Sequence, residues 1–343
     1  MTASLSLEKK DKTPIYRQIH GQLAEAIRDG SLKAGQMLPS MNEMADHFGI
    51  SRESVKKAYS LLCKDNLVVP RQGKGFFVAD NPGNRQPDIL VILDKQSIYK
   101  QTLLQSFQDK IGGKAHLTIL VHNQNLDVFE YYLNTHLDNF DFYVISPHFD
   151  LDKESQARAV RLMKRIPNRK LIMVDHWLKG VSGNYGVVYQ DFENDAYLGL
   201  SAAADDLVRC GHLRVVIMPN SMYGSIVLSS VKAFASERGI KLSVSRSVPD
   251  TFEKGDIILM LNSQLDYGLT LISRNIRKSG LSVGGDIRLI SYNEFSLNEI
   301  IMGGLTTIST DFEKMGSLAA EMVLSGKMSK IHNDFRMTRR HTF

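Results

Sequence analysis

The sequence predicts an α/β protein in which a small helical domain with a β-hairpin precedes a larger unit of two doubly wound parallel sheets. In residues 1–80, apolar residues recur at helical spacing in three successive segments. From residue 88 onward, short continuous apolar runs alternate with helical segments, which is typical of parallel strands covered by helices on both faces. The length of 343 residues allows two domains with separate cores.

The excess of positive charge is concentrated near the start of the chain. The net charge is +5, and residues 1–80 hold 12 Lys/Arg against 9 Asp/Glu, a balance of +3. A positive excess there favours a polyanionic partner. Cys63 and Cys210 are too far apart to suggest a disulfide framework or a zinc site. The chain shows neither a secretory signal nor a membrane-spanning run, so we expect a cytoplasmic protein without a membrane partner.

Three amphipathic helices are predicted in the first domain. The first follows Pro14 and carries an apolar residue at every fourth position. The second begins at a capping-box pattern formed by Ser40 and Glu43. Gly49 makes the turn to a third helix, which Ser51 caps.

The spacing of Ala45, Gly49 and Val55 is typical of a helix-turn-helix. With its apolar positions facing inward, the third helix presents small polar and basic side chains outward: Ser51, Arg52, Ser54, Lys56 and Lys57. The free N–H groups and positive dipole of a helix N-terminus suit phosphate, and an arginine there can fork onto a guanine edge. For the two lysines, a solvated face of a structural helix is the alternative.

A small hairpin is predicted directly after the third helix. Two β-prone runs at 67–69 and 76–78 flank the sequence RQGKG. Its tip carries Arg71, Gln72, Gly73 and Lys74, which form a wing able to reach the minor groove or the DNA backbone.

Residues 14–79 resemble the winged helix-turn-helix of the GntR family of bacterial transcription regulators. Four motifs stand in the family's order and spacing: YRQI, IRDGSLKAGQMLPS, SRESV and GKGFFV. The resemblance implies DNA contacts by Arg52, by Ser54 and by the wing at 73–75.

Two residues depart from the pattern of that family. Asn42 stands where an arginine is usual, so a cationic contact is lost, and Phe76 replaces the threonine of the wing. Ser40 and Asn42, both in or beside the LPS motif, complete the expected DNA-facing set.

The composition of residues 80–88 predicts a linker. It separates a domain of residues 1–79 from a domain of residues 89–343. Strands are expected at 88–94, 116–122, 140–147, 170–177, 184–191, 214–219, 256–262 and 286–293. About ten strands are more than one sheet of this kind usually holds, so two lobes are expected.

Ligands bind beyond the carboxyl ends of such strands. Polar and aromatic residues gather there, and we expect them to bind an effector: Asp94, Tyr99, His148, His176, Trp177, Asp191, Asn262 and Asn293.

Residues 184–326 resemble the effector domain of the LacI/GalR repressors and of periplasmic sugar-binding proteins. The segments that carry the resemblance are YQDFENDAYLGLSAAADDLVRCGHLRVVIM, LNSQLDYGL, GGDIRLISYNE and GGLTTISTDFEKMG. It implies two lobes joined by three chain crossings, with the effector between them. The first lobe is expected at about 89–188 plus 305–325, and the second at about 189–304 plus 326–343.

The same resemblance implies effector contacts by Tyr99, Asn262 and Asn293, the last an amide in place of an aspartate. The ligand-binding arginine of relatives is replaced by Ser230 or one of its neighbours. Without that cation we expect a neutral sugar rather than a carboxylate or phosphate.

Together these features predict a homodimeric transcription regulator that binds double-stranded operator DNA and a sugar. No catalytic, metal or cofactor motif appears, so neither an enzyme nor a cofactor is expected. Two alternatives stay open: a C-terminal domain that only dimerises, and an aminotransferase-like regulator that binds pyridoxal phosphate. The strand-end residues also have ordinary interpretations, as packing and turn residues for His148, His176 and Trp177, and as capping or ion-pair residues for Asp94 and Asp191.

Overall fold

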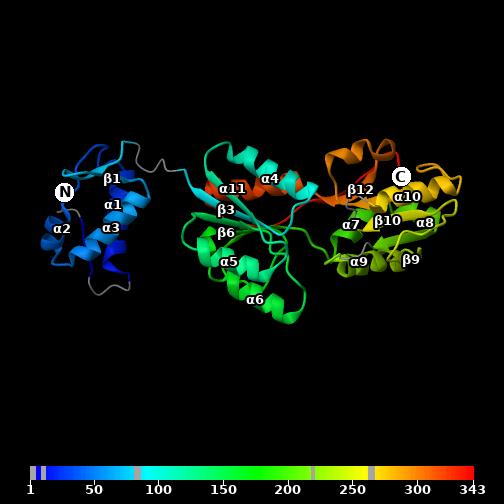
Figure 1. The fold of residues 1–343 in the computed structure, drawn as a ribbon, viewed down its shortest axis with the longest axis horizontal. Coiled ribbons are helices and arrows are strands. Elements are labelled where there is room, and N and C mark those ends of the chain that lie inside the picture. Colours follow the sequence, from blue (N-terminus) through cyan, green and yellow to red (C-terminus); the bar gives the residue numbers. More distant parts are fainter. Residues whose placement is uncertain (1–4, 9–12, 81–85, 218–220, 262–266) are drawn as a thin grey trace. The chain divides into compact units, whose positions relative to one another are not determined.

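The computed structural model describes residues 5–8, 13–80, 86–217, 221–261 and 267–343. The chain divides into two compact units, and the division falls between Gln86 and Pro87, inside the predicted linker. Each unit is described by itself (Figure 1).

The first unit is a bundle of helices with a β-hairpin. Its elements are α1 (Ile15–Arg28), α2 (Met41–Phe48), α3 (Arg52–Lys64), β1 (Val68–Arg71) and β2 (Gly75–Val78). The strands are antiparallel, with Arg71 opposite Gly75. Val55, Ala58 and Leu62 of α3 are fully buried, which confirms the inward face predicted from their spacing.

The predicted helix boundaries of this unit are confirmed in detail. Ser40 Oγ accepts a hydrogen bond from the Glu43 N–H, and the Glu43 carboxylate accepts one from the Ser40 N–H at 2.7 Å. Gly49 ends α2 in the left-handed region, with φ 57°. This conformation suits glycine and lets the chain turn directly into α3.

Ser40→Ala is expected to lower the free energy of unfolding of the first unit by about 1 kcal/mol, because the Glu43 N–H loses its partner. Urea denaturation of the full chain, monitored by a signal that reports the unfolding of the first unit, measures this loss of stability. Ser60→Ala, at an exposed position within α3, is the matched control and should cause no loss. Equal stability of the two variants would contradict the capping role.

The first lobe of the second unit holds six parallel strands within the described residues, in the order β13-β7-β6-β5-β3-β4. The strands are β3 (Asp88–Leu93), β4 (His116–Val121), β5 (Phe142–Ile145), β6 (Leu171–Asp175), β7 (Gly186–Tyr189) and β13 (Lys330–His332). The helices are α4 (Ile98–Ile111), α5 (Leu126–His136), α6 (Lys153–Met163), η2 (Asn168–Lys170) and α11 (Phe312–Ser325).

Successive residues of the first lobe's strands are buried on opposite faces of the sheet. On β3, Ile89 and Val91 pack with α4 and α11, whereas Leu90 and Ile92 pack with α5 and α6. Figure 1 shows these two helix pairs on the two sides of the sheet. A Cβ on Gly316 of α11 would lie 2.1 Å from a backbone oxygen of α4, so only glycine permits this close helix contact.

The second lobe also holds six strands within the described residues, in the order β14-β12-β11-β10-β8-β9. The strands are β8 (His212–Ile217), β9 (Lys241–Ser245), β10 (Ile257–Leu261), β11 (Arg288–Tyr292), β12 (Thr306–Thr310) and β14 (Phe335–Thr338). The helices are α7 (Asp195–Ser201), α8 (Ala204–Cys210), α9 (Gly224–Glu237), α10 (Tyr267–Lys278), η3 (Ser296–Glu299) and η4 (Ile301–Gly303). All neighbouring strands are parallel except β14, which runs antiparallel to β12.

Within the described residues the chain passes between the lobes three times: from β7 to α7, from β12 to α11 and from β13 to β14. The predicted two-lobed, doubly wound fold is therefore confirmed, but two lobe boundaries near the C-terminus are wrong. Residues 305–310 belong to the second lobe, because β12 pairs with β11 and β14. Residues 330–332 belong to the first lobe, because β13 pairs with β7.

Across the described parts of the chain, no helix is both long and apolar enough to cross a membrane.

Candidate functional site

The N-terminal end of α3 forms an exposed polar and basic surface. Ser51 caps the helix by accepting a hydrogen bond from the Ser54 N–H at 3.2 Å, and the two hydroxyls lie 2.8 Å apart. Arg52, Lys56 and Lys57 are exposed, while Ser54 is half-buried. The helix end thus offers cationic side chains beside the positive end of the helix dipole, as the sequence predicted.

The predicted wing is an exposed hairpin turn. All four residues of its tip, 71–74, are exposed, and Gly73 and Gly75 have φ 71° and 107°. The Arg71 guanidinium lies 4.6 Å from the Phe77 ring centroid, which orients the side chain at the tip. Phe76 contacts Tyr59 edge to face at 5.0 Å, so the residue that departs from the family pattern anchors the wing on the core.

The two remaining residues of the expected DNA-facing set lie at the start of α2. Asn42 is exposed. Ser40 is exposed as well, although its hydroxyl oxygen caps the helix.

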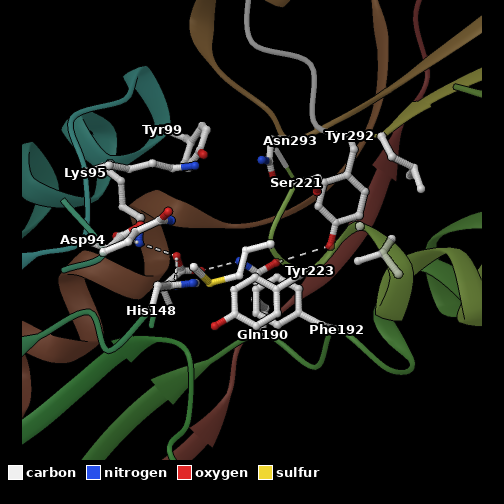
Figure 2. A pocket seen from close by; sticks show the side chains of 17 residues that line it. Asp94, Lys95, Tyr99, His148, Gln190, Phe192, Ser221, Tyr223, Tyr292 and Asn293 are labelled. Carbon is white, nitrogen blue, oxygen red and sulfur yellow. Dashed lines mark hydrogen bonds and ion pairs between the residues drawn. The ribbon is translucent and has the colours of Figure 1, made fainter. Parts of the chain in front are cut away.

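In the second unit, a pocket lies between the two lobes (Figure 2). The first lobe and the first crossing contribute Asp94, Lys95, Tyr99, Lys100, Gln124, His148, Asp175, Gln190 and Phe192. The second lobe contributes Ser221, Met222, Tyr223, Gly224, Val227, Leu261, Tyr292 and Asn293. Four of the predicted effector residues meet here: Asp94, Tyr99, His148 and Asn293.

The other predicted effector residues lie elsewhere. His176, Trp177 and Asp191 line an adjacent hollow, which shares three residues with the pocket: Gln190, Phe192 and Tyr223. The Trp177 Nε1–H donates to the Tyr185 hydroxyl at 3.1 Å, and burial lowers the pKa of His176 to about 3. Asn262 lies outside the described residues.

Lys100 forms a buried charged network at the floor of the pocket. It lies in the first turn of α4 and is only 1% exposed. Its Nζ lies 2.8 Å from Asp94 Oδ1 and 2.7 Å from Ser146 Oγ, and it also contacts Asp175 Oδ2. His148 Nε2 lies 2.9 Å from that same Asp175 oxygen.

The network keeps its groups charged despite their burial. Burial alone would raise the pKa of Asp94, but the nearby Lys100 charge lowers it to about 2. The pKa of Asp175 is likewise held well below its ordinary value, against the effect of burial, chiefly by Lys100. Burial would lower the pKa of Lys100, but the two carboxylates raise it above its ordinary range.

A hydrogen-bonded chain connects this network to the second lobe. Gln190, in the first crossing, donates from Nε2 to Asp175 Oδ1. The Tyr292 hydroxyl at the end of β11 in turn donates to Gln190 Oε1 at 3.4 Å (Figure 2). Groups that contact the pocket are therefore coupled across the boundary between the lobes.

Two polar groups in the pocket have no hydrogen-bond partner among the described residues: Tyr223 Oη and Asn293 Oδ1. Their residues are 8% and 7% exposed. The Tyr223 ring stacks on Phe192, with centroids 4.2 Å apart and planes at 7°. Buried polar atoms of this kind are normally satisfied, so they indicate where a hydroxyl or amide of a ligand would bind.

Asp94, His148 and Asp175 lie close enough together to hold a metal ion. However, the Lys100 ammonium already contacts both carboxylates at the place where a cation would bind. The chemistry of this cluster therefore fits an internal ammonium ion better than a metal.

Lys100 and Asp175 are the principal pocket residues that the sequence prediction missed. Asp175 follows the apolar run LIMV directly, which is the usual signal of a strand-end ligand. Lys100 precedes Leu103 and Phe107 on the buried face of α4, so it is a lysine at core spacing. A charged residue at such a position signals a buried ion pair.

Comparison with known proteins agrees with both parts of the fold. Residues 15–78 match the family "Bacterial regulatory proteins, gntR family", and residues 259–341 match the "Periplasmic binding protein-like domain". The chain therefore joins a segment that matches the gntR family to one that matches the periplasmic binding protein-like domain. Both resemblances predicted from the sequence motifs are confirmed.

Relatives of the gntR-family domain include the HTH-type transcriptional repressor NagR of Bacillus subtilis (strain 168). It is 40% identical over 75 residues, which cover 22% of this chain and only 31% of NagR. The arabinose metabolism transcriptional repressor of Geobacillus stearothermophilus is 22% identical over 368 residues, with 92% of each chain covered. The trehalose repressor from Escherichia coli shares the fold of the second unit, with a TM-score of 0.58 and 12% identity over 74% of this chain and all (100%) of that one.

Proposed function

We propose that this chain is a transcription regulator that binds operator DNA as a homodimer and changes its DNA affinity when a sugar occupies the interlobe pocket. The observation that carries the proposal is the presence of both devices in one chain. An exposed cationic helix end with a wing lies in the first unit, and a polar pocket with unpartnered buried atoms lies in the second. The arabinose metabolism repressor aligns with 92% of this chain at 22% identity, which supports the combination of a DNA-binding unit and a ligand-binding unit in one chain.

The proposed DNA contact has two parts. The N-terminal turn of α3 enters the major groove, where Arg52 reads a base and the flanking serines and lysines approach phosphates. The wing at 71–74 contacts the minor groove or the backbone beside it. A homodimer presents two such units to a two-fold-related operator.

The proposed ligand is a neutral molecule rich in hydroxyl groups. Asp94 and Asp175 are both ionised acceptors, and Lys100 balances one of their two negative charges, so an anionic ligand would be repelled. Tyr223 and Asn293 both line the pocket, and each has a buried oxygen without a partner among the described residues. The stacked rings of Phe192 and Tyr223 supply the flat apolar contact that a sugar ring needs.

The ligand acts by favouring one arrangement of the lobes. Because both lobes line the pocket, a ligand that bridges them binds one interlobe arrangement more tightly than another. In a dimer, the resulting change would alter the spacing or orientation of the two DNA-binding units through residues 80–88. The coupling is as large as the ligand's difference in affinity for the two states.

The test combines two screens of the full chain. Selection from a random duplex library should recover a two-fold-related DNA motif, and a thermal-shift panel of monosaccharides, sugar phosphates and nucleosides should give a stabilising sugar. A recovered motif without any stabilising ligand would support a second unit that only dimerises. Failure to recover a motif would overturn the proposal.

A further inference from the structure

An acidic side chain lies in the middle of the proposed DNA-reading surface. Glu53 is the second residue of α3, between Arg52 and Ser54. Its side chain is 63% exposed, and its carboxylate lies 3.8 Å from the Lys56 ammonium one turn later, which is equally exposed. The two charges therefore form a solvated surface pair that contributes little to folding.

In the free protein, Glu53 has an ordinary role in its helix. A carboxylate in the first turn interacts favourably with the positive end of the helix dipole. Aspartate at this position, or glutamate elsewhere in the first turn, would do the same. The helix alone therefore does not explain a carboxylate at the centre of a surface that is otherwise basic and neutral polar.

When the protein binds DNA, the charge of the duplex limits where the Glu53 carboxylate can lie. The duplex carries one negative charge per about 1.7 Å of its axis, so a carboxylate beside the phosphates is repelled. It is tolerated in the major groove only where a base offers a hydrogen-bond donor. Glutamate is suited to the N4 amino group of cytosine, whereas glutamine pairs with adenine through N6 and N7.

We propose that Glu53 is a specificity-determining residue, which accepts a hydrogen bond from the N4 amino group of a cytosine in each operator half-site. This inference rests on the proposed function, since it requires the N-terminal turn of α3 to enter the major groove. Lys56, released from Glu53 in the complex, becomes available to a phosphate. Glu53 thus selects sequence at the cost of some non-specific affinity.

The test uses Glu53→Gln in the full chain, because the change removes the charge and keeps the shape. Two opposite effects are expected. Preference for cytosine at one position of each half-site should fall by about tenfold, the factor that 1.4 kcal/mol represents. Affinity for an unrelated duplex at low salt should rise, because a negative charge has left the DNA-facing surface.

Glu25→Gln is the matched control, since Glu25 is exposed on α1 of the same unit. It should leave the selected motif unchanged. Both variants and the wild type are put through the same random-library selection, followed by affinity measurement on duplexes that differ at the cytosine position. Melting of the first unit confirms that both variants are folded.

Each result decides a separate point. Loss of cytosine preference in Glu53→Gln, but not in Glu25→Gln, supports the inference. If the wild type selects a motif that Glu53→Gln also selects unchanged, the inference is wrong while the proposed function stands. If the wild type selects no motif, the proposed function is wrong, and the inference that depends on it is wrong as well.

Discussion

Replacing Lys100 by methionine is expected to lower the free energy of unfolding of the second unit by about 3–5 kcal/mol. Methionine fills a similar volume but removes the ammonium group that lies against Asp94, Ser146 and Asp175. Two buried carboxylates then face each other without the Lys100 ammonium, so the folded state must either bear their repulsion or take up a proton. Either outcome destabilises the fold.

Urea denaturation of the full chain, monitored by the fluorescence of Trp177, measures the loss in the second unit, since Trp177 is the only tryptophan. Lys110→Met is the matched control because Lys110 is exposed near the end of the same helix. Its unfolding free energy should stay within about 0.5 kcal/mol of wild type. A Lys100→Met variant as stable as the Lys110→Met control would show that the network does not hold the pocket together.

Lowering the pH should shrink the difference between wild type and Lys100→Met. In the wild type the Asp94 carboxylate, with its pKa lowered to about 2, contributes stability that is present above its unfolded pKa near 4. That contribution is lost as the pH falls through about 2. The variant lacks the Lys100 ammonium that stabilises the ionised carboxylate, so protonation costs it less and its stability should fall less over the same interval.

Arg52→Ala is expected to weaken binding to the selected operator by about 1–3 kcal/mol, or roughly five- to 150-fold. Arg52 is the first residue of α3 and its side chain is exposed, so its loss removes a base contact without disturbing the core. The preference for the base pair that it reads should relax at the same time, which a lost phosphate contact would not cause.

Affinity for operator variants, measured at fixed salt, tests this prediction. Arg28→Ala removes the same charge from the exposed C-terminal end of α1 and should have a much smaller, sequence-independent effect. If the two variants lose equal affinity and both keep the full base preference, the assignment of α3 as the reading helix is wrong.

Local signals were sufficient to predict the first unit from its sequence. The capping box at Ser40, the left-handed turn at Gly49 and the buried stripe from Val55 to Leu62 all depend on neighbours within one or two helical turns. The strands that the sequence missed in the second unit are polar or short. β9 (Lys241–Ser245) and β12 (Thr306–Thr310) contain mainly polar residues, so they lack the apolar run that marks a buried strand.

The sequence predicted where the pocket lies, but only some of the residues that line it. Strand ends were the right region, yet the residues predicted at β6 and β7 do not line this pocket. His176 and Asp191 line the adjacent hollow, Asp175 lines the pocket, and Gln190 lines both. His176, Gln190 and Asp191 lie past the ends of β6 and β7, where the regular alternation of strand side chains no longer fixes which hollow a residue lines.

Operator affinity measured with and without the stabilising sugar tests the central claim most directly. We expect saturating sugar to change the affinity of the wild type by about five- to 150-fold, the range of ordinary allosteric coupling. Asn293→Ala should retain the sugar-free affinity but require more sugar for the same change, since its side chain lies in the pocket. Unchanged operator affinity in the wild type, at a sugar concentration that demonstrably fills the pocket, would contradict the account.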